Sequence, residues 1–393
     1  MSNLINYSKP KIFNQDIQNV IKIFKSGNLT QGKFINTFEK KISKFVGSKY
    51  SLAVSNASAA LHLACAAMKL NKNDIVWCSS ITFISSISCA MHYKSKIDLV
   101  EISDKDFNVD VNKLEKKLIN AKRTKKLPKL IILTHLGGNP CNLKEIFDLR
   151  KKFKFKIIED ASHALGSKYR GQYIGNCKFS DITIFSFHPV KTITTLEGGI
   201  ITTNKYNIYK EINILRTLGI DRVSNKSNKS FKHHWYYEVK KLGYNFRLPE
   251  IQASLGLSQL ANLKRIVKKR NSIAKYYRKK LKNNNFFNYQ NIKEENLSSY
   301  HLFIIKTKKN LSINQKIKFY ELMLKNKVKL QLHYVPLYKH PLIKNYIKKK
   351  FKNYINSEMY FKNCFSIPLY YDLSIKKQNY ILSKLDKCIK LIV

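Results

Sequence analysis

The sequence is poor in acidic side chains and in arginine. Its 393 residues include 25 aspartates and glutamates against 73 lysines and arginines, of which only nine are arginine. A net charge of +48 would by itself predict a nucleic-acid-binding protein. Phosphate and base recognition favours the planar guanidinium of arginine, however, and the lysines are spread along the whole chain. We therefore attribute the charge to composition bias and expect the basic runs 268–270, 278–280 and 348–352 to be solvated helix faces.

Patterns typical of disulfide frameworks, metal sites and membrane spans are also missing. The seven cysteines are odd in number and contain no C-x-x-C pair, so we expect small core residues in a reducing cytoplasm. The ten histidines lack H-E-x-x-H spacing, so we expect no metal site, and His233 and His234 are predicted at the surface. No apolar run approaches the roughly 18 residues of a membrane span, and the first residues lack an apolar signal region. These absences predict a cytoplasmic protein.

The segment 181–204, DITIFSFHPVKTITTLEGGIITTN, is the most informative part of the chain. DITIFSF and GGIITTN have the β-branched and aromatic character of buried strands, and a polar turn between them carries Lys191. A lysine on a rigid turn can be desolvated, lose its proton and attack an aldehyde such as that of pyridoxal phosphate. Ser186 could donate its hydroxyl to the cofactor phosphate. In so lysine-rich a chain, position alone does not establish this role.

A second segment, KFKFKIIEDASHALGSKYRG, ends an apolar strand on Asp160, with His163 three residues later. A carboxylate at the carboxyl end of such a strand faces the crevice where open α/β sheets bind ligands. Opposite a pyridine nitrogen it would keep that nitrogen protonated, so that the ring accepts electrons. His163 could then lie against the ring or bind its phenolic oxygen. The alternative for Asp160 alone is a helix cap or turn residue.

A third segment, SNASAALHLACAAMKL, follows the strand-like YSLAVS and predicts a tight turn and a helix capped by Asn56 or Ser58. The free N–H groups at the start of a helix form an anion site. We assign Ser58 and Ala59 to the cofactor phosphate. Taken alone, the segment fits an ordinary capped helix equally well.

Together these residues resemble the DegT/DnrJ/EryC1/StrS family of sugar aminotransferases. The resemblance runs nearly from end to end, through the ordered motifs LTQGKFINTFEKK, SNASAAL, SSITFISS, EDASHALGSKY, FSFHPVKTITTLEGG, GYNFRLPEIQASLGLSQL and VKLQLHYVPLY. It implies an α/β protein of PLP-dependent transferase fold type I, similar to aspartate aminotransferase. Length and composition agree with a large mixed-sheet domain at 1–250 and a smaller α+β domain at 251–393, joined by a helix that begins near Pro249.

The resemblance also implies a role for single residues. Lys191 would attach pyridoxal 5'-phosphate covalently, Asp160 would pair with the pyridine nitrogen, and His163 would contact the ring or its phenolic oxygen. The phosphate would be held by Ser58, Ala59 and Ser186. Asn245 matches an asparagine that reaches into the phosphate site of a neighbouring subunit, which predicts a homodimer with a shared active site.

Further matches are less distinctive. Phe83 stands where the family places an aromatic side chain beside the cofactor, although a core phenylalanine fits as well. Gly32, His333 and Tyr334 match positions near the substrate. Arg216 matches a family arginine to which we assign no role. Leu218 replaces a histidine that is common in that loop, which leaves the reading of the loop open.

The resemblance implies transamination, because family members that act as dehydratases have histidine at the position of Lys191. The motifs are most similar to the pseudaminic acid branch of the family. They imply transfer from L-glutamate to C4 of a UDP-linked 2-acetamido-2,6-dideoxy-4-keto-hexose, the step that gives UDP-4-amino-4,6-dideoxy-N-acetyl-β-L-altrosamine. Two alternatives stay open. One is another nucleotide-linked keto sugar (dTDP-linked, GDP-linked or 3-keto), and the other is a basic binding protein that has lost turnover.

Overall fold

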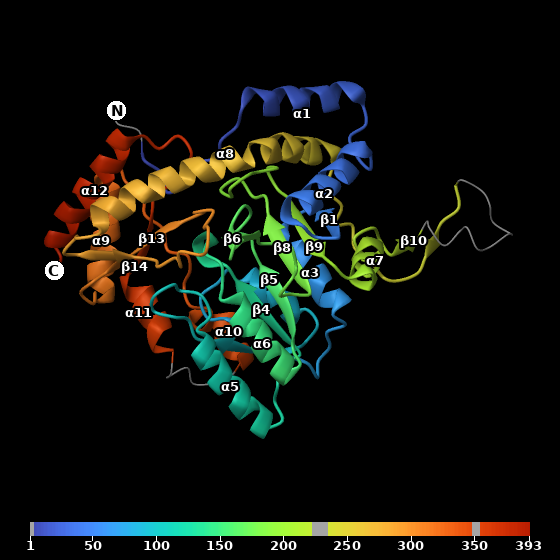
Figure 1. Cartoon of the computed structure of the whole chain (residues 1–393), viewed down its shortest axis with the longest axis horizontal. Coiled ribbons are helices and arrows are strands. Elements are labelled where there is room, and N and C mark those ends of the chain that lie inside the picture. The colour runs from blue at the N-terminus through green and yellow to red at the C-terminus, as the bar shows by residue number, and fades with distance from the viewer. Residues whose placement is uncertain (1–3, 222–234, 348–353) are drawn as a thin grey trace.

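The computed structural model describes residues 4–221, 235–347 and 354–393. The predicted surface histidines His233 and His234 and the basic run 348–352 lie outside these ranges. A twisted sheet covered by helices occupies the middle of the molecule, and a smaller sheet with its own helices lies to one side (Figure 1). The α/β fold class expected from the sequence is confirmed.

The central sheet has seven strands in the order β1-β9-β8-β5-β4-β2-β3. β9 runs antiparallel to the other six strands, so the sheet is mixed. In β4, β8 and β9 every residue is buried, as expected for strands covered on both faces. The strands are β1 (Tyr50–Val54), β2 (Ile75–Ser79), β3 (Lys96–Val100), β4 (Leu130–Thr134), β5 (Lys156–Asp160), β8 (Ile182–Ser186) and β9 (Gly199–Thr203).

Helices cover both faces of this sheet, because successive strand residues point to opposite sides. One face carries Ile131, Ile157 and Phe185 and packs on α2, α5 and α6, whereas the other carries Ile132 and Ile158 and packs on α3, α4 and α7. These helices are α2 (Lys33–Val46), α3 (Ala57–Ala67), α4 (Ser85–Met91), α5 (Val111–Arg123), α6 (Leu143–Phe153) and α7 (Tyr206–Leu215).

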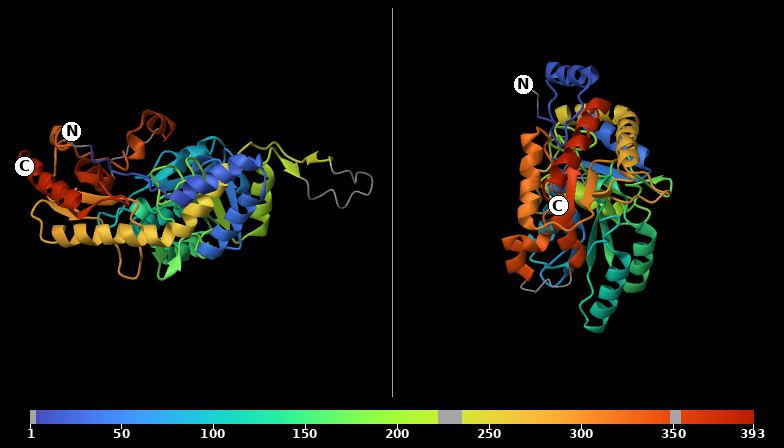
Figure 2. Two further views of the ribbon diagram at one scale, coloured as in Figure 1. Left: turned by 90° about the horizontal axis from the view of Figure 1, so that it is seen from above. Right: turned by 90° about the vertical axis from the view of Figure 1, so that its left-hand side faces the viewer.

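The helix α8 (Glu250–Leu281) links the two parts of the molecule (Figure 2). It begins directly after Pro249, as the sequence predicted. Its first half contributes Leu263 and Ile266 to the core of the central sheet, and its second half contributes Ile273 and Tyr277 to the core of the smaller sheet. Across its first half lies α1 (Asn14–Ser26). A single helix thus fixes one part relative to the other.

One basic run on α8 differs from its prediction. Lys268 and Lys269 are exposed, as expected of a solvated face, but Arg270 is buried. Its guanidinium donates to the carbonyl oxygens of Tyr300 at 3.0 Å and Leu369 at 3.2 Å. The prediction was wrong for Arg270 because a guanidinium carries several donors and can satisfy backbone acceptors inside the protein.

The smaller sheet is antiparallel in the order β12-β13-β14 and packs against α9, α11 and α12. Ile5, near the start of the chain, bridges Val328 and belongs to the same core. The domain boundary at residue 250 stays a prediction. The elements are β12 (Phe287–Tyr289), β13 (Phe303–Thr307), α9 (Ile313–Lys325), α11 (Ile355–Asn363), β14 (Cys364–Ile367) and α12 (Ile375–Lys390).

Short elements connect the larger ones: η1 (Leu136–Gly138), β6 (Lys168–Tyr169), β7 (Gln172–Tyr173), β10 (Ile220–Asp221), β11 (Glu238–Val239), η3 (Leu337–Lys339) and α10 (Pro341–Ile347). All seven cysteines are buried free thiols, as predicted. In the described part of the chain, no helix is both long and apolar enough to cross a membrane.

Candidate active site

A cavity of about 470 Å³ lies at the carboxyl ends of the central strands. The end of β5, the turn after β8, the start of α3 and the segment 331–334 contribute to its wall. Eight of the predicted site residues line it: Ser58, Phe83, Asp160, His163, Ser186, Lys191, His333 and Tyr334. Gly32, Ala59 and Asn245 do not line it, and the roles of all eleven residues remain predictions.

Asp160 ends β5 with its carboxylate at the cavity. The carboxylate accepts hydrogen bonds from Ser86 Oγ at 2.5 Å, Ser162 Oγ at 2.6 Å and the backbone N–H of Ser162 at 3.1 Å. The bonds to Ser162 form the local turn that was the alternative role of an isolated aspartate. Donors from α4 and from this turn hold the carboxylate in place and stabilise its negative charge.

Lys191 lies in the turn between β8 and β9, which contains no helix, as predicted. Its backbone N–H donates to the carbonyl oxygen of His188 at 2.9 Å, which fixes the turn. Burial lowers the pKa of the Lys191 amine to about 8, and the negative charge of Asp160 opposes part of that shift. The two side chains line the same cavity but form no ion pair within 4.0 Å. The amine is therefore available as a nucleophile and a base close to neutral pH.

His163 lies beside Asp160 in the cavity wall and uses both ring nitrogens. Its Nδ1 accepts from the backbone N–H of Gly137 at 3.2 Å, and its Nε2 is 2.9 Å from the hydroxyl oxygen of Tyr334. Burial, with smaller effects of Lys191 and His333, holds the pKa of His163 well below its usual value. Because both nitrogens of the neutral imidazole already have hydrogen-bond partners, the flat face of the ring is the part that can contact another aromatic ring.

The start of α3 also borders the cavity. Asn56 is the N-cap, and its side chain accepts from the backbone N–H of Ala59 at 2.8 Å. The Ser58 hydroxyl is exposed and 2.7 Å from that of Ser85. Ser58 and Ser186 thus offer hydroxyls to an anion at a helix start, whereas the N–H of Ala59 already has a partner.

Phe83 belongs to the cavity and not to a core. Its side chain is 52% exposed, and its ring centre lies 5.7 Å from that of Tyr334. The alternative of a core phenylalanine is therefore wrong. The sequence could not decide this, because residues 80–84 form an irregular connection between β2 and α4 and not a strand with an inner face.

Gly32 and Arg216 have structural contacts outside the cavity. Gly32 precedes α2, whose first N–H groups, those of Phe34 and Ile35, donate to the buried carboxylate of Glu250 at 2.8 and 3.0 Å. A Cβ on Gly32 would meet that carboxylate at 2.8 Å. The guanidinium of Arg216 forms an ion pair with Glu39 of α2 and donates to the carbonyl oxygen of Ala53 in β1. It joins α7 to α2 and β1.

The sequence did not reveal three further residues of the site. Tyr7 and His301 line the cavity, and Ser86 binds Asp160 from α4. The imidazole of His301 lies 4.3 Å from that of His163 between ring centres, and its buried Nδ1 has no partner among the described residues. No motif marks Tyr7 or His301, which reach the site from distant parts of the chain, whereas Ser86 ends the motif SSITFISS, in which only Phe83 was given a role.

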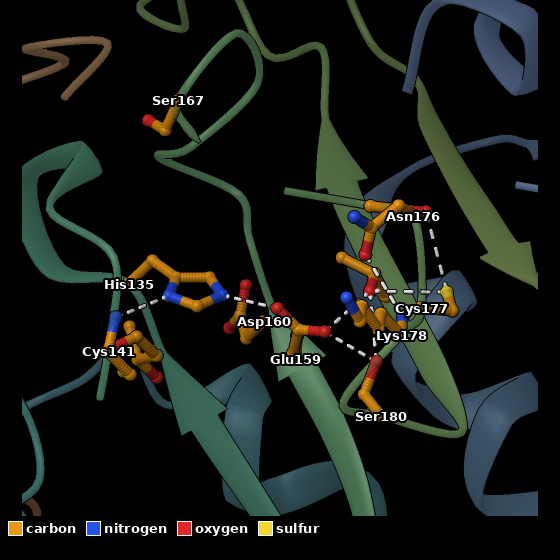
Figure 3. A network of polar contacts seen from close by, with 12 residues as sticks. His135, Cys141, Glu159, Asp160, Ser167, Asn176, Cys177, Lys178 and Ser180 are labelled. Atoms are coloured by element: carbon orange, nitrogen blue, oxygen red, sulfur yellow. Dashed lines mark hydrogen bonds and ion pairs between the residues drawn. The ribbon is translucent and has the colours of Figure 1, made fainter. Parts of the chain in front are cut away.

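A second polar network is built around Glu159, the neighbour of Asp160 on β5 (Figure 3). Glu159 accepts from His135 Nε2 at 2.8 Å, from Thr183 Oγ1 at 3.0 Å and from the Ser180 hydroxyl. His135 Nδ1 accepts from the backbone N–H of Cys141 at 3.0 Å, so its proton is on Nε2 and points at Glu159. Glu159 does not line the cavity. This network fastens β5 to β4 and β8 below the site.

Comparisons with known proteins agree with this geometry. A transaminase of Campylobacter jejuni, named for UDP-4-amino-4,6-dideoxy-N-acetyl-β-L-altrosamine, is 32% identical over 378 residues, which are 96% of each chain. Helicobacter pylori PseC, an aminotransferase involved in the biosynthesis of pseudoaminic acid, superimposes with a TM-score of 0.88 at 28% identity over 99% of this chain and 100% of its own. Spr1654 of Streptococcus pneumoniae in its PLP form has the same TM-score at 27% identity, with 99% of this chain and 100% of its own covered.

The family model for DegT/DnrJ/EryC1/StrS aminotransferases matches residues 10–386. The solved relatives superimpose over nearly the whole chain, which confirms the expected transferase fold. Aminotransferases of this family depend on pyridoxal phosphate, and the amine and carboxylate that such a cofactor needs face one cavity here. The chain therefore belongs to the DegT/DnrJ/EryC1/StrS aminotransferase family.

Proposed function

We propose that this protein transfers the amino group of L-glutamate to C4 of a UDP-linked 2-acetamido-2,6-dideoxy-4-keto-hexose. The product would be UDP-4-amino-4,6-dideoxy-N-acetyl-β-L-altrosamine. The reaction class is supported by one observation. The Lys191 amine has its pKa lowered to about 8 and faces the same cavity as the Asp160 carboxylate. The sugar is supported by the names of the Campylobacter jejuni transaminase and of a Helicobacter pylori transaminase that carries the same name.

The residues present fit pyridoxal phosphate. The hydroxyls of Ser58 and Ser186 and the start of α3 suit its phosphate, because a helix start favours anions. Asp160, held by three hydrogen bonds, suits the protonated pyridine nitrogen. The face of His163 suits the ring. The amine of Lys191 is partly unprotonated at neutral pH and suits the aldehyde.

When bound, pyridoxal phosphate supplies a carbon that carries the amino group and a ring that accepts electrons. Lys191 removes the proton from the amino-bearing carbon of the donor and later delivers a proton to C4 of the sugar. Asp160 keeps the pyridine nitrogen charged while this happens, and His163 supports the ring from its face. Since one amine delivers the proton, it reaches C4 from one side only, so the shape of the cavity sets the configuration of the new amine.

The amine at position 191 also supports transamination over dehydration. A histidine, which the dehydratases of the family have there, cannot attach the cofactor through an aliphatic amine. Lys191 can do so, and the lowered pKa shows that its surroundings favour the neutral amine. An aminotransferase needs this group twice, as nucleophile and as proton carrier.

We further propose a homodimer in which Asn245 reaches the phosphate of the partner's cofactor. Asn245 is exposed and does not line the cavity of its own chain. The nearby arm formed by β10 and β11 extends away from the body of the molecule, and its Trp235, Val239 and Leu242 are 63%, 64% and 91% exposed (Figure 1). Apolar side chains on an extended arm favour burial against another chain. We place the reaction in the cytoplasm, in keeping with seven free thiols.

The decisive experiment supplies the purified protein with pyridoxal phosphate, glutamate and a panel of UDP-, dTDP- and GDP-linked keto sugars, and identifies the products by mass spectrometry. We expect amination of the UDP-linked 4-keto sugar and no product with Lys191→Ala. Amination of another panel member alone would replace the proposed sugar. A colourless protein that ignores pyridoxal phosphate and binds nucleic acid with a steep salt dependence would replace the enzyme.

The shared site has its own test. A subunit with Asn245→Ala is mixed with a subunit with Lys191→Ala, and activity is measured in the mixed dimers. In a shared site, one of the two cavities in each mixed dimer then combines an intact Lys191 with an intact Asn245. We expect recovered turnover. Lack of recovery in proven mixed dimers would contradict the shared site.

A further inference from the structure

The proton on His163 has a position that its neighbours determine. The backbone N–H of Gly137 points at Nδ1 over 3.2 Å, so Nδ1 is an acceptor and carries no proton. The single proton of the neutral imidazole must then be on Nε2. Because Nε2 is 2.9 Å from the Tyr334 hydroxyl oxygen, His163 donates and Tyr334 accepts. The direction of this bond follows from geometry, although the two residues are 171 positions apart.

A glycine turn fixes the N–H that selects this tautomer. Gly137 and Gly138 have φ of 70° and 92°, a region that favours glycine. A Cβ on Gly137 would lie 2.9 Å from Gln290 Oε1. The amide of Gln290 is held in turn by the carbonyl oxygens of Asp106 at 2.7 Å and Leu136 at 3.0 Å. The donor to His163 is therefore part of a packed backbone turn and cannot change with protonation.

The Tyr334 hydroxyl has a proton left to donate. Its oxygen already accepts from His163, and no described residue accepts from it. Burial raises the pKa of Tyr334 above its usual value, with the charge of Asp160 adding to the shift, so the hydroxyl keeps its proton. Tyr334 lines the cavity together with Lys191 and Asp160. The remaining direction for this proton is toward a molecule in the cavity.

We propose that Tyr334 donates a hydrogen bond to a carbonyl or anionic oxygen of the bound ligand, and that Gly137 and His163 orient it for this task. The inference rests on the proposed function, which brings two sources of such an oxygen into the cavity: the phenolic oxygen of the cofactor and the oxygens of the substrates. His163 is a positioning residue in this respect. Its ring face contacts the cofactor, and the hydrogen bond to the ligand comes from the tyrosine.

The test removes one oxygen atom by Tyr334→Phe. One readout is the dissociation constant of pyridoxamine phosphate from the apo-protein, measured by fluorescence; the other is kcat/KM for glutamate and for the sugar. We expect the dissociation constant to rise about tenfold or more, or kcat/KM to fall about tenfold or more, as for the loss of a hydrogen bond to a charged group. Tyr277→Phe is the matched control, since Tyr277 is fully buried, donates to the carbonyl oxygen of Pro368 at 3.0 Å and lies outside the cavity.

The two readouts separate the two sources. Weaker pyridoxamine phosphate binding identifies the cofactor oxygen, and unchanged binding with a lower kcat/KM identifies a substrate oxygen. If both readouts of Tyr334→Phe stay within about twofold of wild type, the inference is overturned while the aminotransferase stands. If wild type aminates no sugar on the panel, the proposed function fails, and the pyridoxamine phosphate measurement still decides whether Tyr334 contacts the cofactor.

A double substitution tests the orienting role of His163. His163→Phe keeps an aromatic face toward the cofactor and removes the N–H that directs Tyr334. We expect Tyr334→Phe to cost clearly less in this background than in wild type, because the hydroxyl is no longer held toward the ligand. An equal cost in both backgrounds would overturn the orienting role. Thermal melting of all variants shows whether each is folded.

Discussion

Glu159 and Asp160 are neighbours on β5 but face opposite sides of the sheet, and they show how one strand serves two purposes (Figure 3). Their side chains are similarly inaccessible, with 2% and 4% exposure, and each carboxylate accepts three hydrogen bonds. The difference is what lies beyond them. Glu159 faces side chains of the neighbouring strands, whereas Asp160 faces the cavity with Lys191.

The comparison shows that burial and hydrogen bonding of a carboxylate do not by themselves identify a functional group. Both charges would be costly to bury without donors, and both have them. Only Asp160 shares a cavity with an amine whose pKa is lowered to about 8. We therefore expect changes on the cavity side to reduce turnover and changes on the Glu159 side to reduce stability.

Lys191→Ala should have the largest effect on turnover. Loss of the nucleophile and proton carrier is expected to reduce kcat at least about a thousandfold. The melting temperature should change little, because the side chain lies in a turn outside the sheet. The exposed loop lysine Lys178 offers a matched control, Lys178→Ala. Borohydride treatment of loaded wild type should fix the cofactor to the peptide that contains Lys191; an adduct found only on another peptide would contradict the assignment.

Asp160→Asn should have the next largest effect, about a hundredfold loss of kcat, because the neutral amide no longer stabilises a protonated pyridine nitrogen. Cofactor content, measured by absorbance after dialysis, should stay close to that of wild type, since Ser58 and Ser186 are unchanged. A variant that loses its cofactor but is otherwise fully active on resupply would show that Asp160 serves binding alone.

Glu159→Gln tests the side of β5 that faces away from the cavity. The amide keeps one oxygen acceptor, but its NH2 group replaces the other oxygen and faces hydroxyls that donate to that oxygen in the wild type. The free energy of unfolding should therefore fall by about 2 kcal/mol. Urea denaturation measures this loss. Turnover per folded molecule should stay within a few-fold of wild type, and a hundredfold loss with normal stability would erase the distinction between the two faces.

The rate at which the apo-protein captures pyridoxal phosphate should depend on pH through Lys191. Only the neutral amine attacks the aldehyde, and the pKa of about 8 means that it carries a proton below that pH. The capture rate should therefore rise about tenfold per pH unit below pH 8 and level off above it. Stopped-flow absorbance checks this, with Lys191→Ala as the blank. A rate still rising steeply at pH 10 would indicate an unshifted lysine.

Local pattern predicted much of the fold. The strands around Lys191, the strand that ends on Asp160 and the helix that begins after Pro249 lie where periodicity and turn residues placed them. Buried Arg270 and exposed Phe83 were not predictable in this way. Their surroundings come from segments far along the chain, and a pattern of neighbours does not contain that information.

The candidate site likewise contains residues that the sequence predicted and residues that it did not. Sequence named the amine, the carboxylate and the imidazole, because residue type at a strand end or turn is visible in the chain itself. It missed Ser86, Tyr7 and His301, which approach from other elements. It also left open how His163 binds, since the answer depends on the N–H of Gly137 and the hydroxyl of Tyr334.

What the sequence alone determined is the set of chemical groups and the local elements that carry them, because both depend on residues within a few positions of each other. The tertiary structure decided that the desolvated amine of Lys191 faces the cavity, which of two adjacent carboxylates lines that cavity with it, and which nitrogen of His163 carries the proton. Desolvation and hydrogen-bond direction depend on atoms brought together from distant parts of the chain, and these contacts exist only in the folded protein.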